Sequence, residues 1–347
     1  MYQAMLGAYK SIYWELYMFV DDDAGVDFFD LLEQKAKSGV DVKLIIDALG
    51  SFGLSKKRIT SLKQAGVDVR LFKETKKKIR SWWKRMCTRT HRKILVVDED
   101  IGFIGGVNIQ KNMLNWMDIQ VRIEGNAVHS LLRSFAKLYI LCGGDKANVK
   151  HLLKFTFRVQ SDEKDLEFIY DDGNSTQSKA RRVYTEALLK ARERVILFSP
   201  YYFPDKKFLH ALWKARKRGV HVDMLIPFRS DLRVAQYAAY AYFSVLHKLG
   251  VHLHLSDSMM HGKGVVVDDD WAMIGSSNLD NTSFYDNYEA NVKLREKHIV
   301  GEIKKTVVGW ITKAKRLDIQ RWEKRGYRQR FKEILATTFY KIWHGRK

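Results

Sequence analysis

The stretch HRKILVVDEDIGFIGGVN at residues 91–108 recurs as HGKGVVVDDDWAMIGSSN at residues 261–278. The His, the Lys, the first Asp, the Gly at 105 and 275, and the final Asn recur at a constant offset of 170 residues. A single H-x-K would carry little information, but two copies with the same spacing indicate an internal duplication. We therefore predict two related halves that each contribute one copy.

The duplication extends upstream of both copies. Four pairs of segments follow one another in the same order, namely the apolar strands Ser11–Asp21 and Arg194–Asp205, the helical patterns Phe28–Lys37 and Phe208–Lys217, the strands Ser38–Asp47 and Arg218–Pro227, and the helix–Gly–strand units Leu62–Phe72 and Leu246–Ser256. Strands that alternate with helices indicate an α/β fold. Near-continuous apolar strands suit sheets covered on both faces. Each half is thus predicted to be a mixed β-sheet flanked by helices.

The predicted boundaries divide the chain into three parts. Residues 1–165 form the first half and residues 175–300 the second. Around Ser161–Ser178 a strand is followed by a polar linker. Residues 301–347 have no counterpart in the first half and are predicted to form a basic, amphipathic helical tail.

The repeated motif carries the chemistry. His91 and Lys93 are two residues apart on a predicted strand, so both side chains point to one face, and the same holds for His261 and Lys263. Two facing copies would give one site with two imidazoles and two ammonium groups. Lysines suit the oxygens of a phosphodiester. One imidazole can attack phosphorus while the other transfers protons.

The pattern H-x-K-x4-D-x6-G-[GS]-x-N, present twice, resembles the phospholipase D superfamily over about Ser11–Leu294. The resemblance implies a pseudo-dimer of two phospholipase D-like halves, one shared active site, a phosphohistidine intermediate, and neither a metal nor another cofactor. It implies His91 as the nucleophile and His261 as the acid and base, although the order could be reversed. The catalytic residues it implies are His91, Lys93, Asp98, His261, Lys263 and Asp268.

The same resemblance implies a set of phosphate-binding residues, which are Lys93, Asn108, Lys263, Ser276 and Asn278. Asp98 and Asp268 follow their strands at a turn, which favours a structural role over chemistry.

Each histidine also needs an acid that orients it. Asp118 lies 27 residues after His91, and Glu289 lies 28 residues after His261. The resemblance implies that these are the orienting acids, and we expect each half to supply both members of a pair.

Several other residues are candidates for the wall of the site. Glu15 and Tyr17 lie on the first strand, and Tyr201 and Pro204 follow the equivalent strand of the second half. One histidine of the HLH run at 252–254 could also approach the site.

The amino-acid sequences of several segments resemble those of the bacterial cardiolipin synthase branch of the superfamily. The segments that carry this likeness are IDALGS at 46–51, SPYYFP at 199–204 and GSSNLDNTSFYDNYE at 275–289. One departure is Thr282, which stands where that branch has an Arg in L-D-x-R-S. The resemblance implies transfer of a phosphatidyl group between phosphatidylglycerol molecules with release of glycerol. Lipid hydrolysis, transfer to another alcohol, and cleavage of nucleic acid remain alternatives.

The charge of the chain indicates a polyanionic partner. The formal net charge is +21, and 17 of these charges fall in Lys73–Thr90 and Gly301–Lys347. Both segments interleave bases with aromatic residues, including Trp82 and Trp83 in the first. Those of the tail are Trp310, Trp322, Phe331, Phe339 and Trp343. This pattern favours an anionic phospholipid surface, with Trp82 and Trp83 in contact with it, over nucleic acid. The tail could instead pack on the catalytic body.

The hydropathy and the cysteine content of the sequence indicate where in the cell the protein is located. The sequence contains no apolar run of about 18 residues, which would be needed for a transmembrane helix. It contains two cysteines, too few for a disulfide framework. We therefore expect peripheral binding to the cell membrane from its cytoplasmic face. The oligomeric state is left open.

Overall fold

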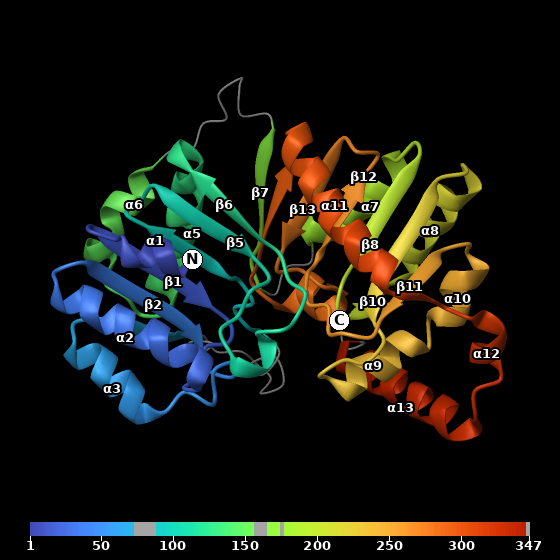
Figure 1. The fold of residues 1–347 in the computed structure, drawn as a ribbon, viewed down its shortest axis with the longest axis horizontal. Coiled ribbons are helices and arrows are strands. Elements are labelled where there is room, and N and C mark those ends of the chain that lie inside the picture. Colours follow the sequence, from blue (N-terminus) through green and yellow to red (C-terminus); the bar gives the residue numbers. More distant parts are fainter. Residues whose placement is uncertain (73–87, 156–164, 174–176, 345–347) are drawn as a thin grey trace.

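The structure, a computed structural model, describes residues 1–72, 88–155, 165–173 and 177–344. Within these residues the chain forms two lobes that lie side by side (Figure 1). Trp82 and Trp83, the predicted membrane contacts, lie outside the described residues. No helix in the described part of the chain has the length and apolar character to cross a membrane.

The first half forms one mixed sheet of β1 (Ser11–Leu16), β2 (Asp41–Asp47), β3 (Asp68–Phe72), β4 (Ile94–Val97), β5 (Ile101–Gly105) and β6 (Gln120–Glu124). The strand order is β3-β2-β1-β4-β5-β6, with β1, β2 and β3 parallel and the others antiparallel. Its helices are α1 (Tyr2–Leu6), α2 (Asp23–Lys37), α3 (Lys56–Gln64), α5 (Val128–Leu141) and α6 (Lys150–Lys154). Asp22 caps α2 by accepting hydrogen bonds from the backbone of Ala24 and Gly25.

The second half repeats this order in a larger sheet. Its strands are β7 (Leu166–Asp171), β8 (Arg194–Phe198), β10 (His221–Pro227), β11 (His252–Ser256), β12 (Gly264–Val267), β13 (Trp271–Gly275), β15 (Glu289–Leu294) and β16 (Lys315–Arg316). The order β11-β10-β8-β12-β13-β15 matches the six strands of the first half, and β16 and β7 extend its two edges. A separate two-stranded sheet pairs β9 (Tyr202–Phe203) with β14 (Leu279–Asp280). The predicted α/β fold with two similar halves is confirmed.

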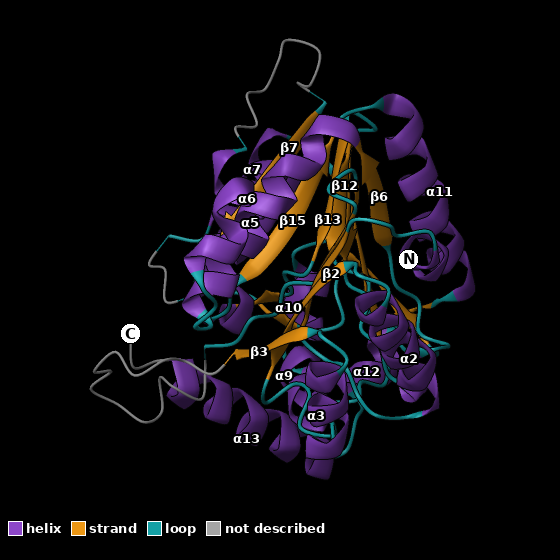
Figure 2. Ribbon diagram, turned by 90° about the vertical axis from the view of Figure 1, so that its left-hand side faces the viewer, coloured by secondary structure: helices purple, strands orange, loops and turns teal. Residues whose placement is uncertain are grey.

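The helices of the second half are α7 (Lys179–Lys190), α8 (Lys206–Lys217), α9 (Arg233–Tyr240), α10 (Phe243–Lys248), α11 (Lys297–Lys313), α12 (Ile319–Glu323) and α13 (Tyr327–His344). Figure 2 shows α13 and α9 at the same end of the molecule as α3. α13 packs against α9.

Two predicted boundaries differ from the structure. The strand expected before the linker is β7, and it pairs antiparallel with β15, so it belongs to the sheet of the second half. The predicted tail at 301–347 begins inside α11, which starts at Lys297 and packs on β11, β12 and β13. Trp310 lies against Phe198, and Trp322 is buried against Tyr240 and Phe243. The first part of the tail therefore covers the second sheet instead of facing outward.

The two halves share one hydrophobic core. One cluster of buried side chains combines Ile94 and Ile104 of the first sheet with Val266 and Val292 of the second. Arg92 lies at this junction and is 3% exposed. Its guanidinium donates to the Ser134 hydroxyl in the first half and to the backbone oxygen of Glu289 in the second, at 3.1 and 3.2 Å. The halves are thus joined by apolar packing and by a buried, hydrogen-bonded cation.

Candidate active site

The two H-x-K segments lie directly before β4 and β12, and not on the strands themselves as predicted. Each segment is held by the other half of the molecule. The backbone N–H of His91 donates to Tyr288 at 2.9 Å, and Tyr288 donates back to Arg89 at 2.8 Å. Likewise His261 donates to Met117 at 2.7 Å. These bridges, between Thr90 and Tyr288 and between Met117 and Met260, bring the two motifs to one place.

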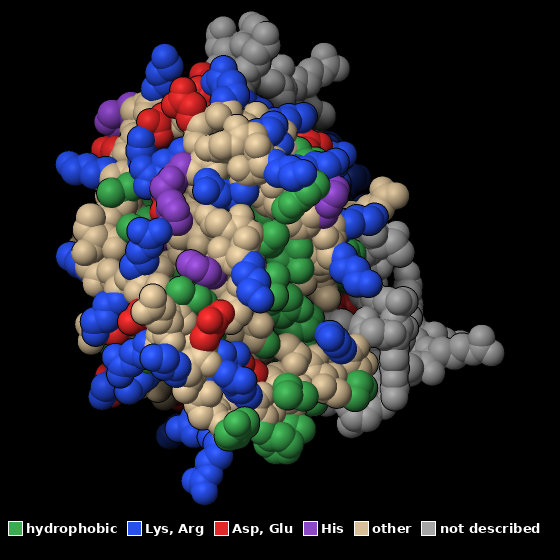
Figure 3. All heavy atoms as spheres, turned by 90° about the vertical axis from the view of Figure 1, so that its right-hand side faces the viewer, with side chains coloured by type: hydrophobic (Ala, Val, Ile, Leu, Met, Phe, Trp, Pro, Cys, Tyr) green, Lys and Arg blue, Asp and Glu red, His purple; other side chains and the backbone are tan. Residues whose placement is uncertain are grey.

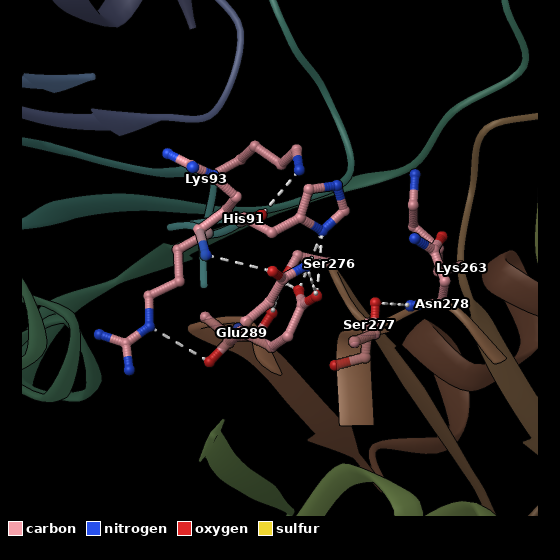
Figure 4. Close-up of polar contacts among 12 residues, drawn as sticks. His91, Lys93, Lys263, Ser276, Ser277, Asn278 and Glu289 are labelled. Carbon is pink, nitrogen blue, oxygen red and sulfur yellow. Dashed lines mark hydrogen bonds and ion pairs between the residues drawn. The ribbon is translucent and has the colours of Figure 1, made fainter. Parts of the chain in front are cut away.

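The carboxylates pair with the histidines across the two halves. His91 Nδ1 lies 3.1 Å from both carboxylate oxygens of Glu289, and His261 Nδ1 lies 2.7 Å from Asp118 Oδ2 (Figure 4 shows the first pair). The order of the sequence suggested that each half pairs its own histidine with its own acid, and that expectation was wrong. The reason is the backbone bridges, because the residue before each acid pairs with the residue before the opposite histidine.

The surroundings of the two acids differ. The hydroxyl of Ser276, predicted to bind phosphate, donates to Glu289 Oε2 and is fully buried. In the first half Gly106 occupies the equivalent position, and a Cβ there would lie 2.2 Å from Asp118 Oδ1. Ser276 therefore supports the orienting acid, while Gly106 makes room for the other one.

Burial and charge tune both pairs. Burial lowers the pKa of His91 below its ordinary value, against the opposing effect of Glu289. Burial also lowers the pKa of His261 to about 4, and Lys263 adds to this effect while Asp118 opposes it. Burial alone would raise the pKa of Asp118, but His261 and Lys263 outweigh it and lower that pKa. Burial alone would likewise raise the pKa of Glu289, but His91 and Lys93 outweigh it and lower that pKa. These directions favour ionised carboxylates and neutral imidazoles, with each Nδ1–H donating to its acid.

Both motif lysines are buried beside the histidines. Lys93 donates to the backbone oxygen of His91 at 2.7 Å, and Lys263 donates to that of His261. Burial lowers the pKa of Lys263 to about 8, and burial together with Lys263 lowers the pKa of Lys93. A lysine cation held away from water attracts an anion strongly, and a bound anion would in turn favour the charged form of both lysines.

A cavity of about 280 Å³ is bordered by both histidines, while Lys93 and Lys263 lie buried behind its lining. His91 and Asn108 line it from the first half, and His261 and Asn278 line it from the second. The oxygen of the Asn108 amide accepts from Met18 N at 3.2 Å, so its NH₂ group is the end available to a substrate. The wall thus presents imidazoles and amides to a single space.

Several wall residues were not identified from the sequence. Arg89, Asp231 and Tyr340 belong to none of the quoted motifs, and Asn287 lies in the quoted segment 275–289 but was given no role. Tyr201 and Tyr17, both suggested as wall residues, do line the cavity, and Thr282 lies there as well. The Tyr201 hydroxyl donates to Asp231 at 2.8 Å. Glu15 instead lies beneath the wall, fully buried, where its carboxylate accepts from Thr90 Oγ1.

The motif aspartates lie at the opposite ends of their strands from the histidines. Asp98 accepts from the backbone of Lys10 and Ser11 at 2.7 and 3.0 Å, and Asp268 accepts from Glu193 and Arg194. Both have positive φ angles, 53° and 50°, at hairpin turns. The prediction that Asp98 and Asp268 are catalytic is therefore not supported. Both instead hold the backbone at the start of the neighbouring strand.

Comparison with known proteins agrees with this geometry. A family model described as "Cardiolipin synthase, PLD-like domain" matches residues 1–139 and 184–308. The chain belongs to this phospholipase D-like family. It is 32% identical to the cardiolipin synthase of Halalkalibacterium halodurans over 300 residues, which cover 84% of this chain and 59% of that protein. It is 29% identical to the minor cardiolipin synthase ClsB of Bacillus subtilis, over 95% of this chain and 82% of that protein.

The fold of this family member is also that of a solved structure. Phosphatidylserine synthase of Haemophilus influenzae aligns with a TM-score of 0.73 and 15% identity, over 98% of this chain and 90% of that one. At this identity the likeness concerns the fold. The chain spans 59% and 66% of the length of two curated relatives, from H. halodurans and Bacillus anthracis.

The crossed pairing predicts that Glu289 and Asp118 are both required for activity. Glu289→Gln and Asp118→Asn should each lower kcat/KM for phosphodiester cleavage by about 100-fold or more, because an unoriented imidazole loses its proton-transfer role. Asp270→Asn, an exposed acid beside the second motif, is the matched control and should retain near wild-type activity. Wild-type activity in either site variant, measured by steady-state kinetics, would contradict the pairing.

The pKa of Lys263 predicts an alkaline limit. This pKa is lowered to about 8, so the side chain is a cation below that pH and neutral above it. Attraction for a phosphodiester anion should therefore weaken as pH rises through about 8, and kcat/KM, which reports the free enzyme, should fall there. A pH–rate profile at constant ionic strength checks this. If kcat/KM stayed constant up to pH 10.5, the ordinary pKa of lysine, Lys263 would not be a buried residue that binds the substrate as a cation.

Proposed function

We propose that the protein transfers a phosphatidyl group from one phosphatidylglycerol molecule to another and releases glycerol. The observation that carries this proposal is the single cavity lined by His91 and His261, each paired with a carboxylate of the opposite half. The chain also belongs to the family described as "Cardiolipin synthase, PLD-like domain", which supports phosphatidylglycerol as the substrate.

In the first step His91 Nε2 attacks phosphorus, and the bond from phosphorus to the glycerol oxygen breaks. Glu289 holds the Nδ1–H of His91 and stabilises the positive charge that develops on the ring. His261, which takes up a proton from solvent at Nε2 when the anionic substrate binds, gives that proton to the leaving glycerol oxygen. The anionic phosphodiester offsets the positive field of the two lysines, which raises the proton affinity of His261 in the complex.

In the second step a hydroxyl of another phosphatidylglycerol loses its proton to His261 and attacks phosphorus. The phosphorus–nitrogen bond breaks and His91 is released. Lys93, Lys263 and the amides of Asn108 and Asn278 would hold the phosphate oxygens in both steps. Water would compete for the intermediate, and the apolar wall residues Met18, Leu49 and Met113 would limit its access.

A lipid substrate requires contact with a membrane, and α13 offers a suitable surface. Its inner side packs on the body through Tyr340, which stacks on Phe203 and lines the catalytic cavity. Its other side exposes large apolar side chains, namely Tyr327, Phe331, Ile334, Leu335, Phe339 and Ile342. We call these six residues the α13 face. Leu232 and Val234 of the neighbouring α9 segment are also exposed, and Leu232 lines the cavity.

The charge around this face suits an anionic surface. The full chain carries a net charge of +21, and α13 contributes Arg328, Arg330, Lys332 and Lys341. Lysine and arginine side chains are spread over the side of the molecule seen in Figure 3, with hydrophobic side chains exposed among them. We therefore place the protein peripherally on the membrane, with the α13 face and the cavity mouth toward the lipid.

Product analysis tests the proposed reaction. Phosphatidylglycerol vesicles incubated with the protein should yield a lipid with four acyl chains and an equal amount of free glycerol. His91→Ala and His261→Ala should each abolish both products, whereas Asp270→Asn should not. Formation of phosphatidic acid alone would replace the synthase with a hydrolase. Cleavage of single-stranded DNA without lipid turnover would replace it with a nuclease.

Vesicle binding tests the surface separately. Phe331→Asp with Ile334→Asp should weaken binding to phosphatidylglycerol vesicles by about 10-fold or more, because each buried apolar side chain is worth roughly 1.5–3 kcal/mol. Tyr9→Asp is the matched control, since Tyr9 is 81% exposed and lies in the first half. Co-sedimentation measures the bound fraction. Equal binding of wild type and the double variant would remove the α13 face from the proposal.

A further inference from the structure

Three histidines and one aspartate gather on the second sheet, outside the catalytic cavity. His221 and Asp223 are two residues apart on β10, and His252 and His254 are two apart on β11. The strands are parallel neighbours, and Asp223 pairs in register with His252. Because side chains alternate along a strand, all four project from one face of the sheet. The structure thus corrects the expectation that the HLH run approaches the catalytic site.

The distances within this cluster are those of a metal site. His221 Nε2 lies 2.9 Å from His252 Nδ1 and 3.2 Å from Asp223 Oδ1, and His252 Nδ1 lies 3.8 Å from Asp223 Oδ1. Ligands bound tetrahedrally at about 2.0–2.1 Å are separated by about 3.3–3.4 Å. The three distances bracket that value, and the three atoms lie within 4.8 Å of one another.

We propose that His221, Asp223 and His252 bind a divalent transition metal of the zinc type. The ligand atoms are His221 Nε2, His252 Nδ1 and Asp223 Oδ1. Two imidazoles and one carboxylate suit Zn²⁺, and a fourth position is left for water. The proposal is independent of the proposed function, since none of the three residues lines the catalytic cavity.

The other neighbours of Asp223 hold it in place. Arg194 donates to Asp223 Oδ2 at 2.7 Å, so Oδ1 is the oxygen that faces the histidines. His254 Nε2 lies 2.8 Å from Oδ1, where it would act as a hydrogen-bonding partner outside the ligand set. Asp223 is 2% exposed, whereas the side chains of His221 and His252 are 44% and 26% exposed. The buried carboxylate is therefore rigid, and the open side is formed by the two histidines, which gives an ion a path inward.

The charges near the cluster decide which ions fit. Arg194 shares the carboxylate, and Arg216 and Arg316 also act electrostatically on His252. Ca²⁺ and Mg²⁺ depend on several oxygen ligands and on negative charge, and one shared carboxylate does not supply these. A transition metal that binds through neutral imidazole nitrogen tolerates this setting.

The bound ion would join strands near the edge of the sheet. β11 also pairs with β16, through His254 with Arg316 and Leu255 with Lys315. β16 leads into α12 and α13, so this edge carries the segment that contributes Tyr340 to the catalytic cavity. Metal bound between β10 and β11 would stabilise the attachment of that segment.

Titration of Zn²⁺ into the chelator-treated full chain tests the proposal. Calorimetry should give one equivalent of bound Zn²⁺, and His221→Ala or His252→Ala should weaken binding by more than the roughly 100-fold upper limit for loss of an outer hydrogen bond. His210→Ala, an exposed histidine outside the cluster, is the matched control and should bind as wild type. Co²⁺ should give the intense visible absorption of a four-coordinate ion in wild type and His210→Ala only.

Two results would overturn the site. One is a wild-type protein that binds no Zn²⁺. The other is binding that stays unchanged in both cluster variants, which would assign the ion to other surface groups. Circular dichroism establishes that each variant is folded. His254→Ala provides a milder second test, with a loss of about 10–100-fold expected from the removal of an outer hydrogen bond.

Discussion

The hydrogen bonds between each histidine and the carboxylate of the opposite half are the interactions on which the rest of the structure depends. They require two separate sheets to meet with their H-x-K segments side by side. The bridges from Thr90 to Tyr288 and from Met117 to Met260 fix this register in the backbone. The shared apolar core and the buried Arg92 keep the two sheets together. A half on its own would have a histidine and an acid, but it would lack both orienting bonds.

The two halves are related without being equivalent. Ser276 donates to Glu289, whereas the matching Gly106 leaves space for Asp118. Arg92 joins the halves, whereas a Cβ at the matching Gly262 would lie 3.2 Å from the Trp310 ring, so a larger side chain there would collide with α11. These differences give the two imidazoles different surroundings. Such surroundings suit a division of labour in which one histidine binds phosphorus and the other transfers protons.

Much of this arrangement could be predicted from the sequence. The repeat of His, Lys and Asn at one offset identified the duplication, and apolar runs such as Ser38–Asp47 identified the strands. The crossed pairing could not be predicted, because it depends on contacts between residues 198 and 143 positions apart, and spacing along the chain pointed to the nearer acid. For the same reason the pattern of bases and aromatics did not separate Trp322, which is buried, from Phe331, which is exposed. The cluster of His221 and His252 becomes visible only once the register of β10 and β11 is known.

The central claim is that one site is assembled by exchange of acids between two halves. Nitrogen-detected NMR of the histidine side chains tests this claim most directly, with the signals of His91 and His261 assigned from the corresponding alanine variants. Asp118→Asn should change the tautomer and pKa of His261 and leave His91 nearly unchanged, while Glu289→Gln should do the reverse. If each substitution instead perturbs the histidine of its own half, the crossed pairing is wrong.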